Sequence, residues 1–213
     1  MSLKTRILVL KRKRAGDQDI LVKAYGQGGI IDLLVRDGLV SGHRFFGVFE
    51  PFNVMELDMS QRGGIALPND VKNVRFLSYI ARDYRRFLWM SWVAGFIMRT
   101  VHYYDERLFS LFLRYLTLSP EKKEHVLRIR LKLDYLELSG LKPKFLDQRG
   151  SGTKLKLSNG SISEEGELEV ELRLLDLIRK IYRARKPERI SLSGELSKRI
   201  EKVLDLLIEY HTR

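Results

Sequence analysis

The feature that most restricts the fold of this chain of 213 residues is a change of hydrophobic period near residue 73. Before that point, short apolar runs are separated by Gly-rich or polar gaps, which is typical of strands joined by turns. After it, apolar residues recur every three or four positions, as on the buried face of a helix. The pattern predicts an α+β protein with a β domain at residues 1–74 and a helical domain at residues 75–213.

Five short strands are predicted in the first domain. Gly26 to Gly29 and residues 60–64 have the composition of hairpin turns. Pro51 falls inside the fourth apolar run, so a bend or bulge is expected there. The predicted strands cover residues 5–11, 19–25, 30–35, 45–59 and a segment that begins at 65–67. Together they predict a small closed or sandwiched β domain.

Helices are predicted through most of the second domain. Ser119, followed by Pro120 and an acidic residue, has the pattern of a helix N-cap, and Ser193 is the expected N-cap of the last helix. The segment 142–166 is rich in Gly, Ser, Lys and Asn, and it predicts an inserted β-hairpin with a type I′ turn at Asn159–Gly160. The predicted helices cover residues 76–103, 105–118, 119–138, 168–184 and 193–212.

Residues suited to catalysis or metal binding are sparse. The chain has no cysteine, so a thiolate metal site is excluded, and its four histidines are far apart in sequence. Gly26 to Gly29 and residues 149–154 lack the spacing of a dinucleotide or phosphate loop. We therefore expect a protein that is not an enzyme and carries no cofactor.

Targeting and membrane segments are not predicted either. The N-terminal apolar run is too short for a signal peptide, and no window of about 18 apolar residues predicts a membrane helix. A cytoplasmic protein without a membrane partner is expected.

The excess of positive charge indicates the class of partner. Basic residues outnumber acidic ones by 39 to 27, which gives a formal net charge of +12. Such an excess favours a polyanion, with nucleic acid first and an anionic membrane surface second. The alternative is that the charge serves only solubility.

Basic side chains of the first domain are the candidates for contact with phosphates. One run comes before the first acidic residue and is expected on a single rim of the β domain, with a merely solvated loop as the alternative. This run is Lys11, Arg12, Lys13 and Arg14. Other candidates at strand ends and turns are Lys23, Arg36, His43, Arg44 and Arg62.

Aromatic residues interleave with these cations, as in surfaces that stack on bases. Tyr25 or Phe45 is the candidate for stacking, whereas Phe46 and Phe49 are expected to fill the interior of the β domain.

A second basic cluster lies at the start of the first predicted helix. Arg82, Arg85 and Arg86 have the spacing that places side chains on one helical face. Contact with phosphate and pairing with Asp83 are equally open for this cluster.

Short motifs occur in a characteristic order along most of the chain. They are Leu8–Arg12, Gly16–Leu21, Tyr25–Gly29, Phe49–Leu57, Arg130–Pro143 and Leu207–His211. In this order and spacing they resemble the RecO family of recombination mediators. The resemblance implies an N-terminal OB-fold barrel and a C-terminal helical domain.

The resemblance also implies function and partners. Proteins of this family bind single- and double-stranded DNA, anneal complementary strands, and work in the nucleoid. The implied protein partners are RecR, the C-terminal tail of single-strand-binding protein and, indirectly, the RecA filament.

Two features depart from the family pattern. Many members carry a four-cysteine zinc motif that this chain lacks, so residues 142–166 are interpreted as a cysteine-free remnant of that module. The loop from Arg36 to Arg44 is also less basic than in the family, which predicts weaker DNA contact there. An RNA-binding OB module and a non-catalytic protein-interaction scaffold remain as alternatives.

Overall fold

The computed structural model describes residues 2–120, 123–148, 150 and 152–212, apart from the side chains of residues 2 and 62. The chain forms two compact units, residues 1–119 and residues 120–213. The first unit contains a β-barrel and two helices, and the second contains three helices and a small sheet. The sequence-based boundary at residue 74 lies inside the first unit, near the end of the last barrel strand and before the helices that pack with the barrel.

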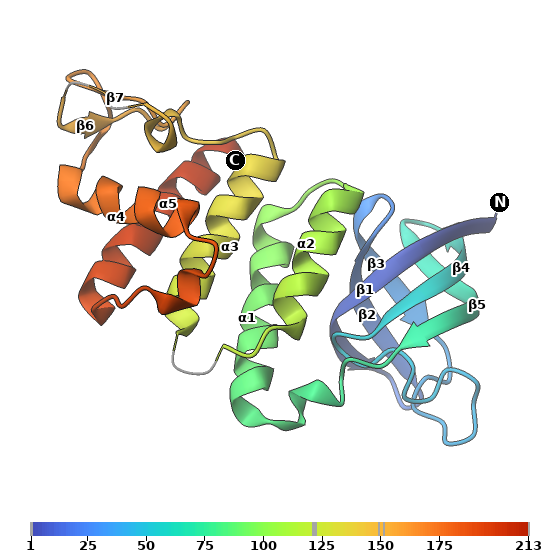
Figure 1. The fold of residues 1–213 in the computed structure, drawn as a ribbon. Coiled ribbons are helices and arrows are strands. Elements are labelled where there is room, and N and C mark those ends of the chain that lie inside the picture. Colours follow the sequence, from blue (N-terminus) through green and yellow to red (C-terminus); the bar gives the residue numbers. More distant parts are fainter. Residues whose placement is uncertain (1, 121–122, 149, 151, 213) are drawn as a thin grey trace. The chain divides into compact units, whose positions relative to one another are not determined.

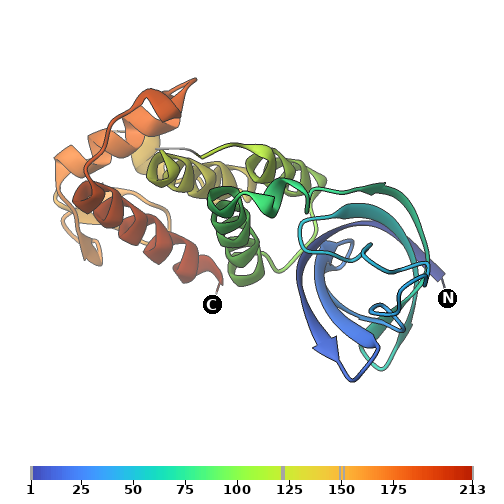
Figure 2. The same ribbon diagram turned by 90° about the horizontal axis from the view of Figure 1, so that it is seen from below.

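Five strands close into the barrel, which Figure 2 shows nearly end-on. Neighbouring strands are antiparallel, except for the third and fifth strands, which pair in parallel. The five strands are β1 (Ser2–Ala15), β2 (Asp19–Gly26), β3 (Gly29–Val35), β4 (Val54–Arg62) and β5 (Ile65–Arg75). The strand order is β1-β2-β3-β5-β4, and β4 pairs back onto β1. This Greek-key strand order is that of the OB-fold. The α+β class and the N-terminal OB-type barrel are thus confirmed.

Apolar side chains from the inner faces of the strands fill the barrel. Alternate residues of β2, such as Val22 and Ala24, point inward and pack against Ile7, Leu33 and Leu57. The period of two in the sequence follows from this arrangement, since successive side chains of a strand point to opposite faces.

The predicted strand 45–59 is wrong in its first half. Residues 45–53 form turns, and β4 begins only at Val54. Phe45 and Phe49 pack into the barrel interior from these turns, so the apolar run there closes the barrel rather than extending its wall. Phe52 has φ 76°, a left-handed conformation that no strand residue adopts.

Asn53 joins this closing loop to the segment that follows the barrel. Its side chain is fully buried, its Nδ2 donates to the Val48 carbonyl at 3.0 Å, and its Oδ1 accepts from the Ser78 N–H at 3.0 Å. Figure 1 shows that loop 36–53 and the segment leading into the first helix lie at the same end of the barrel. One side chain therefore fixes both segments.

Asn53→Ala is expected to lower the free energy of unfolding by about 1–3 kcal/mol, because it leaves the half-buried Ser78 N–H and Val48 carbonyl without their partner. Urea titration followed by tryptophan fluorescence measures this loss in the first unit. Asn69→Ala is the matched control, since Asn69 is exposed and should cost less than about 0.5 kcal/mol. Equal losses in the two variants would contradict the linking role of Asn53.

The first unit continues with η1 (Ile80–Arg82), α1 (Tyr84–Thr100) and α2 (Glu106–Thr117). The predicted helix 76–103 is therefore too long at its start. Asp83 interrupts it in an extended conformation, and its carboxylate accepts from the Arg86 N–H at 2.9 Å as the N-cap of α1. Asp105 caps α2 in the same way. An Asp at this position ends one helical segment and begins the next.

The second unit contains α3 (Glu124–Leu138), α4 (Leu172–Arg183) and α5 (Gly194–Thr212), with short turns η2 (Lys144–Leu146) and η3 (Pro187–Arg189). Ser119 is not an N-cap: Lys123 precedes α3, and residues 121–122 lie outside the described part of the chain. The Ser193 cap is confirmed, because its Oγ accepts from the Leu196 N–H at 3.3 Å.

The expected β-hairpin is confirmed, and a third strand extends it into a small sheet. Its order is β7-β6-β8, formed by β6 (Lys154–Leu155), β7 (Ile162–Ser163) and β8 (Leu168–Glu169). The predicted type I′ turn is wrong, because Gly160 has positive φ but Asn159 does not. The predicted helix start at residue 168 is wrong as well, since those residues form β8.

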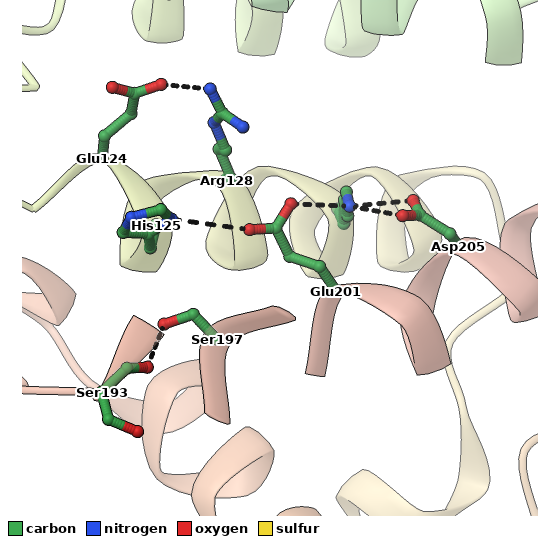
Figure 3. Close-up of polar contacts among 8 residues, drawn as sticks. Glu124, His125, Arg128, Ser193, Ser197, Glu201 and Asp205 are labelled. Atoms are coloured by element: carbon green, nitrogen blue, oxygen red, sulfur yellow. Dashed lines mark hydrogen bonds and ion pairs between the residues drawn. The ribbon is translucent and has the colours of Figure 1, made fainter. Parts of the chain in front are cut away.

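A buried lysine connects α3 to α5. The Lys132 side chain is only 4% exposed, and its Nζ lies 3.2 Å from Glu201 Oε2 and 2.8 Å from Asp205 Oδ1. Figure 3 shows both carboxylates on α5, with Glu201 also 3.9 Å from His125 on α3. Two acceptors thus compensate one buried positive charge.

No helix in the described ranges is long and apolar enough to cross a membrane.

Candidate nucleic-acid interface

One end of the barrel gathers several of the predicted cations. The turn between β1 and β2 contacts loop 36–53 there, through the Leu39 N–H donating to the Gln18 carbonyl at 2.9 Å. An ion pair of 2.8 Å joins Arg12 in β1 to Glu50 in the loop. These contacts hold the loop against the strands and fix the positions of its side chains.

A pocket of about 340 Å³ opens on the wall of the barrel beside this loop. Strands β3 and β5 are paired at a single position, Leu33 with Ala66, and the pocket is lined from residues just beyond it, including Leu34 and Leu67. Three predicted site residues line it together. They are Arg36, His43 and Arg44, and we call this feature the rim pocket.

The cations of the rim pocket are available to a ligand. Arg36 and Arg44 are exposed, and within the described part of the chain neither has a carboxylate partner in an ion pair. The Arg44 guanidinium lies over the Phe45 ring at 4.5 Å, and the His43 ring meets the same phenyl group edge-on at 5.3 Å. Phe45 is buried and therefore supports these two side chains rather than stacking on a base.

Phe46 and Phe45 have exchanged the roles expected of them. Phe46 was expected in the barrel interior, but it is 52% exposed, in the same loop as Arg44. Consecutive residues of an irregular loop have no fixed alternation, so the sequence did not distinguish the two. Phe46 is the exposed aromatic residue of loop 36–53.

Tyr25 cannot stack on a base, because it is fully buried. Helix α2 covers it: its ring packs on Phe109 with centroids 5.8 Å apart, and its hydroxyl accepts from the Asp105 N–H at 3.1 Å. Burial raises the pKa of Tyr25 to about 12. The expectation of an exposed Tyr25 failed because a helix packs on the outer face of β2.

The run from residue 11 to residue 14 is divided between two faces of β1. Arg12 and Arg14 pair in register with Val22 and Ile20, whose side chains fill the barrel, so these arginines share the inward-facing side at its end. The intervening residues face outward. They are Lys11, opposite Lys23, and Lys13, opposite Leu21. The prediction of one common rim for all four is wrong, because β1 extends through the whole run.

Carboxylates pair with part of this set. Arg12 pairs with Glu50, Arg14 lies 3.8 Å from Asp17, and Lys23 lies 2.7 Å from Asp32. These pairs are partly exposed, so each contributes little to stability and a phosphate can compete for the cation.

Arg62 lies at the other end of the barrel. It is the last residue of β4 and pairs with Ile65 across the β4–β5 turn. Its side chain lies outside the described part of the chain.

The second basic cluster does not share one helical face. Arg82 belongs to η1, whereas Arg85 and Arg86 lie in the first turn of α1, beyond the extended Asp83. The Asp83 carboxylate accepts a hydrogen bond from the backbone N–H of Arg86 at 2.9 Å. Arg82 and Arg85 are both exposed.

A five-stranded OB-type barrel that carries a cationic pocket and continues into helices defines a protein of the oligonucleotide-binding-fold class. The family model "Recombination protein O C terminal" matches residues 81–213 of the chain. The chain belongs to the RecO family, which supports a role in DNA repair and recombination.

A relative of nearly equal length is similar over the whole chain. It is an uncharacterized protein of Aquifex aeolicus (strain VF5), 35% identical over 211 residues, which cover 98% of this chain and 99% of the relative.

Proposed function

We propose that the chain is a DNA-binding recombination mediator that binds single- and double-stranded DNA and promotes the annealing of complementary strands. The observation that carries this proposal is the rim pocket, where Arg36, His43 and Arg44 meet on the wall of the barrel. Two exposed guanidinium groups suit phosphate oxygens, and the exposed Phe46 in the same loop suits an unpaired base.

Annealing of this kind needs no general acid or base. Two complementary strands repel each other through their phosphates, and bound cations reduce this repulsion while base pairing provides the driving force. The protein thus acts without catalytic chemistry of its own. The outward-facing Lys11, Lys13 and Lys23, the arginines Arg12 and Arg14, and the cluster Arg82, Arg85 and Arg86 add further phosphate contacts in this proposal.

Membership of the RecO family supports a proposal for the protein partners. We propose that the chain works with RecR and with the C-terminal tail of single-strand-binding protein, and that it assists the loading of RecA. A cytoplasmic, nucleoid-associated location goes with this role.

The double variant Arg36→Ala/Arg44→Ala tests the proposal. It is expected to bind single strands more weakly and to anneal complementary strands more slowly. The slope of log affinity against log salt should become shallower by about 1.4, since each phosphate contact to a single strand contributes about 0.7. Fluorescence anisotropy of a labelled oligonucleotide across a NaCl series measures the slope, and energy transfer between labelled complementary strands measures annealing.

The control is Lys198→Ala/Lys202→Ala, which removes the same charge from exposed positions on α5. Its salt slope should match that of the unchanged protein. If both double variants behave alike, only net charge matters and the rim pocket has no special role. Preference for RNA over DNA of equal length would favour the RNA-binding alternative.

A further inference from the structure

The segment between the barrel and α1 exposes an unusual number of aromatic side chains. Tyr79 is 62% exposed and Tyr84 is 72% exposed, and Phe76, Phe87 and Leu88 are also exposed. We call residues 75–88 the junction segment. Exposed aromatic residues that cluster in this way mark interaction sites, because a folded protein otherwise buries them.

Local structure explains why these rings point outward. Backbone hydrogen bonds form successive tight turns from Leu77 to Arg82, and Asp83 then caps α1. The buried side of α1 is occupied by residues such as Trp89 and Val93. Tyr84, as the first residue of α1, lies before that buried face begins. The segment is held to the barrel by the bond from Ser78 to Asn53, so the rings project from a fixed backbone.

Phe87 gives this surface a rigid base. Its ring meets Phe52, which is buried, with centroids 6.3 Å apart. Phe87 and Leu88 follow Tyr84 at the third and fourth positions along α1, so the three side chains share one helical face. An apolar ledge therefore continues from Tyr84 onto the helix.

The charges around the ledge are positive. Arg75, Arg82 and Arg85 are exposed, and none of them is in an ion pair within the described ranges of the chain. The acidic side chain among them, Asp83, already accepts a hydrogen bond from the helix backbone. Aromatic rings with cations between them suit a ligand that has flat apolar faces and negative charges, and they disfavour an apolar peptide or an acidic surface without rings.

We propose that Tyr79 and Tyr84 form a platform on which unpaired bases of a single strand stack, while the neighbouring arginines contact its phosphates. The inference rests on the proposed function, since both concern the same ligand, but it assigns a separate surface and a separate physical interaction. Stacking needs bases that are not paired, so the platform favours single strands over duplex. Because stacking does not depend on counterion release, added salt should weaken strand binding at the platform less than strand binding at the rim pocket.

The test compares intact and abasic strands of equal length and charge. Tyr79→Ala/Tyr84→Ala is expected to bind oligo-dT at least fivefold more weakly, because one stacked base contributes roughly 5- to 150-fold to affinity. An abasic strand should bind equally well to the variant and to the unchanged protein. Tyr79→Phe/Tyr84→Phe keeps the rings and should bind oligo-dT as the unchanged protein does.

Tyr210→Ala is the matched control, since Tyr210 is a half-exposed tyrosine in the second unit. If Tyr79→Ala/Tyr84→Ala binds oligo-dT with unchanged affinity, the platform is refuted while the rim pocket stands. If the unchanged protein binds no strand at all, the proposed function fails with it. An equal loss on intact and abasic strands would show that the tyrosines act otherwise than by stacking, and would also refute the platform.

Discussion

Glu201→Gln/Asp205→Asn is expected to lower the free energy of unfolding of the second unit by about 3–5 kcal/mol. The variant removes the negative charges of the two carboxylates that contact the buried ammonium group of Lys132 between α3 and α5, and breaking one side of a buried ion pair costs about this much. Hydrogen exchange of the α3 and α5 amides, measured by mass spectrometry in urea, reports the loss in the affected unit.

Lys132→Met is the informative comparison. It replaces the buried cation with an apolar chain of similar length, so it should change the free energy of unfolding far less and can even raise it. Lys198→Met, at an exposed position of α5, controls for loss of a lysine. If the double variant were as stable as Lys132→Met, the two carboxylates would not be compensating the buried charge.

Tyr25→Ala is expected to lower the free energy of unfolding of the first unit by about 3–5 kcal/mol, as large-to-small replacement of a buried aromatic residue does. The ring lies between the barrel and α2, against Phe109 and Phe112. Tyr25→Phe keeps the ring and removes only the hydroxyl that meets the Asp105 backbone, so it should cost about 1 kcal/mol. Chemical denaturation followed by tryptophan fluorescence measures both variants. Equal costs would assign the stabilisation to the hydroxyl and contradict this account.

Titration of the Tyr25 hydroxyl should make the free energy of unfolding of the first unit depend on pH. Burial raises the pKa of Tyr25 from 10.0 to about 12, so the folded state holds its proton more tightly than the unfolded state does. This contribution to stability is fully present below pH 10 and is lost as the pH rises from about 10 to 12. The loss should be smaller in Tyr25→Phe. It does not vanish there, because burial raises the pKa of Tyr104 to about 12 as well.

The period of the sequence predicted the fold class and most strands, because a strand or helix with one buried face repeats its apolar residues at a fixed interval. The prediction failed for segments that are neither strand nor helix and so have no regularly repeating buried face. Phe45 and Phe49 are buried from turns, and turns have no period. The stop at Asp83 was also missed, because a carboxylate that caps a helix resembles in sequence one that pairs with the nearby arginines.

The candidate site was predicted in part for a similar reason. Charge alone indicated Arg36, His43 and Arg44, and the pocket brings them together. Whether a side chain on the outer face of a strand is exposed depends on which distant segments of the chain pack against that face. Helix α2 covers Tyr25, and no local pattern around residue 25 contains that information. The exposed rings of Tyr79 and Tyr84 lie in a segment predicted as continuous helix, so only their exposure in the structure indicates them as candidates.

The amide of Asn53 bonds both to Val48 within loop 36–53 and to Ser78 of the junction segment, so the two segments can separate only by breaking a hydrogen bond of a buried side chain. The loop carries Arg44 of the rim pocket, and the junction segment carries Tyr79 and Tyr84. One buried side chain therefore sets the spacing between the two surfaces proposed to contact a strand.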